Sequence, residues 1–271
     1  MNQHSALSQE DLDRLTRSTF LREVRYHTRL ASTNTHALEL LSVDRTVTCP
    51  SLIYAEEQTT GRGRGANRWW SNPGGLTFSL VLEIAPAGLT TEQTPLVSLL
   101  TGLSVMKACQ TELPRADFSV KWPNDVYLSH RKLAGILVEV PPGRADMLVI
   151  GIGINVNNSF RDASPEIRNT AISLSEVGGR EYDSLSLLER LLVSFEELLS
   201  ELARGENVIE KNWPPHCLLT GKQTTLKSGP RLVTGLCLGV DARGALRLHT
   251  SRGEERFFGG TVESWSNCQG R

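Results

Sequence analysis

FSVKWPNDVYLSHRKLAGILVEV, residues 118–140, contains two apolar runs rich in β-branched residues, with polar turns between them. Residues 118–121 read as one strand, and Pro123 interrupts the pattern because it cannot donate to a strand ladder. SHRK at 129–132 marks a hairpin turn before a second apolar strand. The stretch therefore predicts antiparallel strands joined by a tight hairpin.

The flanking sequence alternates further apolar strands with amphipathic helices. Thr94 followed by Pro95 begins one predicted helix, and Ser186 with Glu189 forms a capping box ahead of a long one. Because helices lie between strands that pair largely through hairpins, we predict an α+β fold with a mixed sheet. The other predicted strands lie at 51–58, 76–84 and 147–157, and the other predicted helices lie within 11–24 and 30–41.

The sequence changes character near residue 218. Beyond this point short strands alternate with Gly and Asp, which is typical of a small SH3-like β-barrel. We therefore predict a polar N-terminal segment over 1–25, a main domain over 26–218 and an SH3-like domain over 219–271. The first segment is too short for a helix-turn-helix domain of its own, so DNA is not an expected partner.

The overall composition argues against several classes of protein. The chain has 29 Lys and Arg against 30 Asp and Glu, so no overall basic field supports nucleic-acid binding by the whole surface. Its five cysteines form no CxxC pair, which indicates neither a zinc site nor a disulfide framework. The sequence shows no apolar run of membrane-spanning length and no signal-peptide pattern. We expect a cytoplasmic protein with no membrane partner.

The stretch TTGRGRGANRWW, residues 59–70, concentrates positive charge on a flexible backbone. Like charges about 4 Å apart repel by roughly 4 kcal/mol at an effective dielectric near 20. A solvated turn or an RGG-like nucleic-acid segment would have this composition. The more specific alternative is an anion-binding site, in which Arg62 and Arg64 present guanidinium groups to carboxylate or phosphate oxygens. Trp69 then either offers a stacking surface to a base or belongs to the hydrophobic core. For Trp70 we expect the role in the core.

A second group of polar residues follows the apolar strands. Pro123 leaves Asn124 and Asp125 at a strand end, where a simple turn or an active site can form. The hairpin can return Lys132 beside Asp125, either as a strand gatekeeper or as a cation aimed at the same anion as the arginines. Asn155 ends an apolar run and needs a hydrogen-bond partner, so it either caps a turn or binds a nucleotide.

Ser32, Thr33 and Asn34 precede an apolar periodic segment, so they form a helix cap and also offer a site for a polar or anionic ligand atom. Standard nucleotide motifs are incomplete. GIGINV has Val156 where a Rossmann turn has its third glycine, and TGKQ at 220–223 lacks the other residues of a phosphate loop. The six histidines show no metal-ligand spacing, and we assign them no chemistry.

Together these motifs resemble the biotin protein ligases, which activate biotin with ATP and transfer it to one lysine of a carrier protein. The resemblance extends from about Ser32 through the C-terminal GVDARGAL and FFGG segments. It implies a catalytic domain related to class II aminoacyl-tRNA synthetases, an SH3-like C-terminal domain, a biotin carboxyl carrier protein as partner, and ATP with Mg²⁺ as cofactors. The motifs occur in the order STN (32–34), GRGR with a following Trp (61–69), KWPND (121–125), KLAGIL (132–137) and GIGIN (151–155).

The resemblance also implies a set of site residues. The implied catalytic residues are Arg64, Lys132 and Asp125, and Asp125 is the implied Mg²⁺ ligand. The implied biotin-binding residues are Ser32, Thr33, Asn34, Gln58, Arg62, Gly63, Arg64, Lys132 and Gly135. The implied ATP-binding residues are Arg62, Trp69, Asn124, Lys132 and Asn155.

The arginine loop departs from the family pattern. The family usually continues as GRGR-x-G-R-x-W, whereas Ala66 and Asn67 stand here in place of the usual Gly and Arg, and Arg68 is shifted by one residue. We therefore assign no contact to Arg68. Two alternative functions stay open, a lipoate–protein ligase with the same adenylation logic and a nucleic-acid-binding module. A homodimer is a possible assembly.

Overall fold

A mixed seven-stranded sheet forms the larger part of the molecule. The computed structural model describes residues 7–44 and 46–267. The strand order is β1-β2-β3-β7-β6-β5-β4, in which β1 and β2 are parallel and the other neighbours are antiparallel. The predicted α+β class with a mixed sheet is confirmed. The strands are β1 (Glu23–Leu30), β2 (Ser51–Gln58), β3 (Leu76–Glu83), β4 (Phe118–Lys121), β5 (Asp125–Leu128), β6 (Arg131–Glu139) and β7 (Met147–Ile154).

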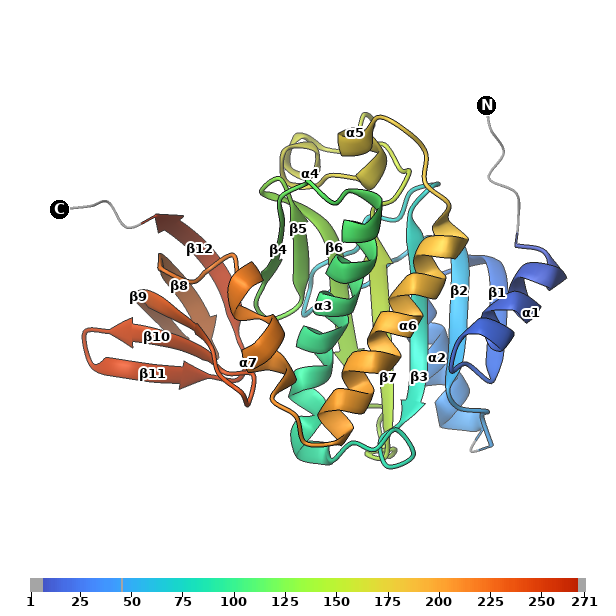
Figure 1. Cartoon of the computed structure of the whole chain (residues 1–271), viewed down its shortest axis with the longest axis horizontal. Helices are drawn as coiled ribbons and strands as arrows, with labels where there is room; N and C mark the ends of the chain where they lie inside the picture. Colours follow the sequence, from blue (N-terminus) through green and yellow to red (C-terminus); the bar gives the residue numbers. More distant parts are fainter. Residues whose placement is uncertain (1–6, 45, 268–271) are drawn as a thin grey trace.

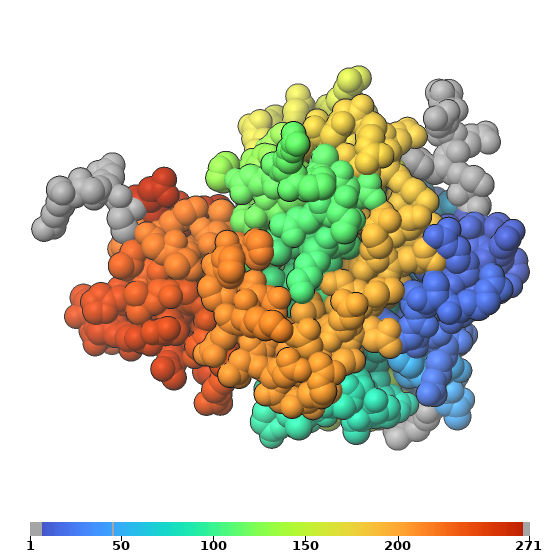
Figure 2. Space-filling view, viewed as in Figure 1, coloured from blue at the N-terminus to red at the C-terminus, as the bar shows by residue number. Residues whose placement is uncertain are grey.

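Helices cover both faces of this sheet. The long helices α3 (Thr94–Glu112) and α6 (Ser184–Ala203) pack against each other across one face (Figure 1), and α2 (Thr33–Val43) covers the other. In the space-filling view, the side chains of α3 and α6 form a continuous layer over the first face (Figure 2). The core therefore lies mainly between the sheet and these two helices, where Leu99, Leu103, Ile152, Leu191 and Phe195 are fully or almost fully buried.

Shorter helical segments connect these elements. They are α1 (Gln9–Ser18), α4 (Pro165–Thr170), α5 (Leu174–Gly178) and α7 (Val208–Asn212), with 3-10 turns η1 (Thr91–Gln93) and η2 (Pro214–His216). Within the described residues, no helix is both long and apolar enough to cross a membrane.

A five-stranded antiparallel sheet follows η2 and lies beside β4 (Figure 1). The predicted boundary at residue 218 falls between η2 and β8, and residues 1–6 and 268–271 of the predicted terminal segments lie outside the described residues. The indole Nε1 of Trp122 donates to the Gly244 carbonyl at 3.0 Å, so the KWPND segment is bonded directly to this C-terminal sheet. The strands, in the order β11-β10-β9-β8-β12, are β8 (Lys222–Ser228), β9 (Arg231–Val240), β10 (Leu246–Thr250), β11 (Gly253–Phe257) and β12 (Thr261–Asn267).

The N-terminal prediction was wrong in part. The helix predicted within 11–24 ends at Ser18, and the residues from Glu23 onward form β1. Thr19 has an extended backbone that ends the helix, and β1 then gains parallel hydrogen bonds with β2. The sequence did carry a signal for β1, because Val24, Tyr26 and Leu30 alternate with polar residues, and the prediction overlooked it.

The predicted capping box of the long helix was also wrong. Asp183 is the N-cap of α6, and its carboxylate accepts from the backbone N–H groups of Leu185 and Ser186 at 3.0 and 3.2 Å. Asp caps a helix as well as Ser does, and its earlier position lets α6 begin before Ser186. Glu189 pairs instead with Arg14, whose Nε lies 2.8 Å from it.

Candidate functional site

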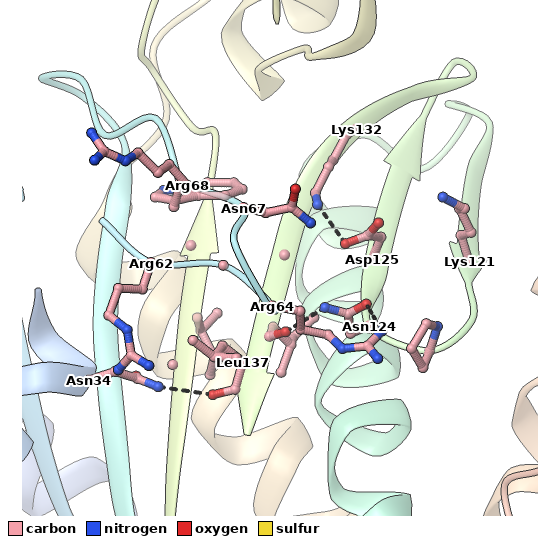
Figure 3. A pocket seen from close by; sticks show the side chains of 18 of the residues that line it. Asn34, Arg62, Arg64, Asn67, Arg68, Lys121, Asn124, Asp125, Lys132 and Leu137 are labelled. Atoms are coloured by element: carbon pink, nitrogen blue, oxygen red, sulfur yellow. Dashed lines mark hydrogen bonds and ion pairs between the residues drawn. The ribbon is translucent and has the colours of Figure 1, made fainter. Parts of the chain in front are cut away.

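A cavity of about 400 Å³ lies over the sheet between the arginine loop, the N-terminus of α2 and the β4–β5 turn. All of the predicted site residues except Asn155 line this cavity. Figure 3 shows how several of the others converge from these separate segments. The predicted residues that line it are Ser32, Thr33, Asn34, Gln58, Arg62, Gly63, Arg64, Trp69, Asn124, Asp125, Lys132 and Gly135.

One end of the cavity is a network of uncharged polar groups. Ser32 is the N-cap of α2, as the sequence predicts, and Thr33 and Asn34 occupy its buried first turn. The Gln58 side-chain carbonyl accepts from the Thr33 backbone N–H at 2.7 Å. Ser79, which the sequence did not mark, lies 2.8 Å from the Thr33 hydroxyl and donates to Asn34 Oδ1 at 2.6 Å. These bonds fix the orientation of the donors and acceptors at this end.

Glu139 connects this network to the arginine loop. Its carboxylate accepts from Asn34 Nδ2 at 2.9 Å and from both Nη atoms of Arg62 at 3.0 and 2.7 Å. Two parallel bonds from a guanidinium hold both partners in a defined geometry. Sequence reasoning missed Glu139, although an acid at the end of an apolar strand was the available signal. Arg62 is therefore held beside the polar end by a carboxylate of the protein.

Arg64 is a half-buried cation with neutral partners. Its Nη2 donates to the Gly260 carbonyl at 3.0 Å, and its Nη1 lies 3.5 Å from Asn124 Oδ1. Burial lowers the pKa of Arg64, and the nearby negative charge of Asp125 partly offsets this effect. Within the described residues no carboxylate forms an ion pair with Arg64. A desolvated cation with neutral partners attracts an anionic guest strongly.

Lys132 and Asp125 form an ion pair on adjacent strands. Lys132 Nζ lies 2.6 Å from Asp125 Oδ1, and the Asp125 side chain is 14% exposed. The turn between β5 and β6 places Ser129 and His130 at positive φ, which gives the two-residue hairpin that SHRK predicts. The predicted approach of Lys132 to Asp125 is confirmed.

Lys121 is a further cation that sequence reasoning missed. Its Nζ lies 4.5 Å from the ring centroid of Trp265 and 5.8 Å from that of Tyr127, and its side chain lines the cavity. Burial lowers the pKa of Lys121, while Asp125 opposes that shift. This contact could not be predicted because Lys121 and Trp265 are far apart in the sequence.

Trp69 packs closely against the sheet because glycines leave room for its ring. A Cβ added at Gly153 would lie 2.4 Å from Cε2 of Trp69, and one added at Gly135 would lie 3.3 Å from the ring. A Cβ at Gly151 would likewise lie 2.1 Å from Asn34 Oδ1. The glycines of GIGIN thus admit Trp69 and Asn34, which explains their presence in a strand where glycine is otherwise unfavourable.

Replacing Gly153 with alanine should loosen the arginine loop. The new methyl group cannot share its place with the Trp69 ring, so the ring moves and the Trp69 N–H bond to the Gly61 carbonyl, 3.0 Å long, weakens. We expect hydrogen exchange of the Trp69 amide to accelerate at least tenfold. Gly102→Ala is the control, because its new Cβ would have no neighbour closer than 3.9 Å. Equal exchange in the two variants would contradict this role for Gly153.

Asn155 and Trp70 lie outside the cavity, and Arg68 lies at its edge. Asn155 is buried, donates to the Lys132 carbonyl at 3.3 Å and accepts from Asn158 at 3.1 Å, so it supports the backbone beneath Lys132. The core role expected for Trp70 is wrong, because Trp70 is half-buried and lies against Phe160 near the surface. Arg68 lies at the cavity rim and points away from Lys132, whereas Asn67 points toward it (Figure 3).

The cavity is strongly cationic in a nearly neutral chain. The whole chain has a formal net charge of −1, whereas five basic side chains line the cavity with a single carboxylate, Asp125. The five are Arg62, Arg64, Arg68, Lys121 and Lys132. Such concentrated positive charge suits a ligand with several negative charges, such as a nucleotide triphosphate. The uncharged network at the other end suits a polar ring without charge. The two ends of the cavity therefore differ in chemistry.

Comparison with known proteins agrees with this chemistry. Residues 26–155 match the model of the Biotin/lipoate A/B protein ligase family. The chain is 31% identical over 242 residues to the bifunctional ligase/repressor BirA of Bacillus subtilis, covering 88% of this chain and 73% of that protein. It is 29% identical to the biotin–[acetyl-CoA-carboxylase] ligase of Paracoccus denitrificans, covering 86% of this chain and 99% of that protein.

A solved structure gives a similar result. Biotin protein ligase from Aquifex aeolicus in complex with biotin and ATP superposes with a TM-score of 0.76 at 30% identity, covering 91% of this chain and 100% of that one.

Proposed function

The chain belongs to the biotin/lipoate A/B protein ligase family as a biotin protein ligase, and from this premise we propose how its cavity joins biotin to ATP and passes it to a carrier lysine. The reaction forms biotinyl-5′-AMP and then transfers biotin to one lysine of a biotin carboxyl carrier protein. The observation that carries the proposal is one cavity in which an uncharged polar network adjoins five basic side chains.

The polar network is our proposed biotin site. Asn34, Thr33 and Gln58 present oriented amide and hydroxyl groups that complement the ureido ring. The biotin carboxylate then points toward Arg62, Arg64 and Lys132. Trp69 supplies a ring on which adenine stacks, an interaction worth roughly 1–3 kcal/mol.

The first step needs charge stabilisation rather than a protein nucleophile. The biotin carboxylate attacks the α-phosphate of ATP and pyrophosphate leaves, while negative charge grows on the phosphate oxygens. Lys132, Arg62 and Arg64 lie around one cavity and can stabilise that charge, which is often the largest single contribution to catalysis. Asn124 bonds to the Ile136 carbonyl at 2.7 Å and lies near Arg64, so it helps to hold that guanidinium in place.

Mg²⁺ is part of this proposal. Magnesium in nucleotide sites is usually held by one or two carboxylates together with substrate phosphates. Asp125 fits this role, since its carboxylate lines the cationic cavity. Among the described residues, this site included, no group of three or more His, Cys, Asp or Glu could hold a metal by itself, so the phosphates of ATP would complete the coordination. When bound with ATP, the ion supplies further neutralisation of phosphate charge.

The second step needs a neutral amine. An acceptor lysine has a pKa near 10.4 and must lose a proton before it attacks the acyl carbon. We assign this task to Asp125, which already accepts a lysine ammonium, that of Lys132, in the ligand-free protein. The attack forms the amide and breaks the bond between the acyl carbon and AMP, which leaves. The ammonium gives up one proton before the attack and a second as the amide forms, and both pass through Asp125 to solvent.

Replacing Lys121 with arginine should change the alkaline side of the pH profile for adenylate formation. Burial lowers the pKa of Lys121, so its charge is lost at a lower pH than that of a free lysine. A guanidinium stays charged throughout, so the fall in rate above neutral pH should move to higher pH in Lys121→Arg. Pyrophosphate exchange between pH 7 and 10 measures this. An unchanged alkaline limb would exclude Lys121 from the activation step.

The nearest alternative substrate is lipoate. A direct test measures pyrophosphate release with ATP and equal concentrations of biotin or lipoate, followed by mass spectrometry of a carboxyl carrier domain. We expect release to be at least 100-fold faster with biotin, and the carrier to gain one biotinyl group. Release stimulated equally by lipoate would reject biotin specificity, and release with neither acid would reject the ligase function.

Cytoplasmic location, a homodimer and the absence of a DNA partner stay predictions. Sedimentation of the purified protein with and without biotin and ATP tests the dimer.

A further inference from the structure

A second hollow, of about 450 Å³, adjoins the reaction cavity. The two share Arg64, Pro123, Asn124 and Ile136 as lining residues, so their walls are continuous. We call this hollow the apolar groove, because its outer part is lined mainly by Ile84, Pro95, Val138, Val140, Ala145 and Phe258. It is formed jointly by the end of β6, the start of α3 and the loop between β11 and β12.

Two apolar side chains of the groove are unusually exposed. Phe258 is 52% exposed and Val140 is 48% exposed. Phe258 directly follows β11 of the C-terminal sheet and Val140 directly follows β6 of the main sheet, yet both line the same groove. Large apolar side chains gathered around one hollow, rather than scattered singly, are typical of interaction surfaces.

The chemistry of the second step restricts where a partner can sit. A lysine side chain reaches about 6 Å from Cα to Nζ, given bond lengths near 1.5 Å. An acceptor lysine aimed at Asp125 therefore brings the backbone of its own protein to the rim of the reaction cavity. The apolar groove begins at that rim, on the side of Arg64 and Asn124.

An exposed cation lies beside the apolar groove. The guanidinium of Arg243 lies over the Phe258 ring, with Cζ 5.4 Å from the centroid. Arg243 is exposed and forms no ion pair with a carboxylate in the described part of the chain. An exposed cation stacked on an exposed aromatic ring complements a partner that offers a carboxylate beside an apolar side chain.

We propose that the apolar groove docks the acceptor segment of the carrier protein, with an apolar residue near the acceptor lysine seated between Val140 and Phe258 and an acidic residue facing Arg243. This inference rests on the proposed function. It gives the two sheets a joint role, because neither Val140 nor Phe258 forms the surface alone. Affinity for the carrier then depends on residues that adenylate formation does not use.

The experiment separates docking from activation. Val140→Asp, Phe258→Asp and Arg243→Glu are compared with the unmodified protein in two assays. The first is biotin-dependent pyrophosphate exchange without carrier. The second is transfer of biotin to the unmodified carrier domain of an acetyl-CoA carboxylase. We expect kcat/KM for the carrier to fall at least tenfold in each aspartate variant, mainly through KM, while exchange changes less than twofold.

Leu232→Asp is the matched control. Leu232 is 68% exposed on β9 of the C-terminal sheet and does not line either hollow. The same charge placed there should leave both assays unchanged, and melting temperatures of all variants check that they are folded. Unchanged carrier kinetics in both aspartate variants would overturn the proposal, as would an equal loss of exchange and transfer.

Two further outcomes are decisive. A dimer that Val140→Asp dissociates without any change in transfer would show that a second copy covers the groove, which also overturns the proposal. Unmodified protein without biotin-dependent exchange would instead reject the proposed function, independently of the groove.

Discussion

Replacing Lys132 with alanine should reduce the rate of biotinyl-5′-AMP formation by about 10³-fold, at the upper end of the loss seen when one group that stabilises a transition-state anion is removed. Lys132 is the cation nearest to Asp125, and its Nζ lies 2.6 Å from that carboxylate. Its loss removes positive charge from the reacting phosphate and leaves Asp125 without its ion-pair partner. Rapid quenching of ATP, biotin and enzyme, followed by separation of the adenylate, measures the effect.

A variant that keeps the charge separates electrostatics from folding. Lys132→Arg should recover part of the rate, because its charge is retained although its planar head fits the site less well. Lys107→Ala, a lysine outside the cavity, controls for the general loss of a basic residue. Adenylate formation by Lys132→Ala at the rate of the unmodified enzyme would exclude the assigned role.

Replacing Arg64 with glycine should release the adenylate into solution. Arg64 ties the loop to the C-terminal sheet through the Gly260 carbonyl and to the β4–β5 turn through Asn124. Without these bonds the loop opens more often, and water and foreign amines reach a mixed anhydride that the closed loop protects. We expect adenylate to dissociate about 10–100-fold faster, as a loss of two hydrogen bonds to a charged group implies.

Leakage has a clear chemical signature. Arg64→Gly should biotinylate lysines of an added bystander protein such as albumin, whereas the unmodified enzyme should not. Arg68→Gly is the matched control in the same loop, because Arg68 points away from the reaction centre (Figure 3). Tight adenylate retention by Arg64→Gly, or equal labelling by the two variants, would contradict the role of the loop as a cover.

Local patterns predicted the parts of the site that depend on neighbouring residues. The SHRK turn identified the hairpin that brings Lys132 beside Asp125, because a two-residue turn pairs Tyr127 with Lys132. The bulge that shifts the register beyond Tyr127 was not predicted. Ser32 was recognisable as a helix cap because a capping residue directly precedes the helix that it caps. The arginine loop was recognisable from composition, although its own bonds, such as Gly63 N–H to the Asn67 carbonyl at 2.9 Å, were not.

Contacts between distant segments could not be predicted in this way. Arg64 and Gly260 are 196 residues apart, and Lys121 meets Trp265 only because the C-terminal sheet docks beside β4. The acid at the end of β6, Glu139, drew attention to itself only as a strand-end charge, and its bonds to Asn34 and Arg62 depend on how α2 and the loop are placed around it. The geometry of such contacts follows from how whole sheets pack, which no short pattern encodes.

The central claim is that the arginine loop closes over biotin and ATP as they react, and hydrogen exchange of residues 59–69 tests it most directly. The account predicts slow exchange of the Gly63 and Trp69 amides when both substrates are present, faster exchange without them, and loss of the difference in Arg64→Gly. Equal exchange with and without biotin and ATP would contradict it.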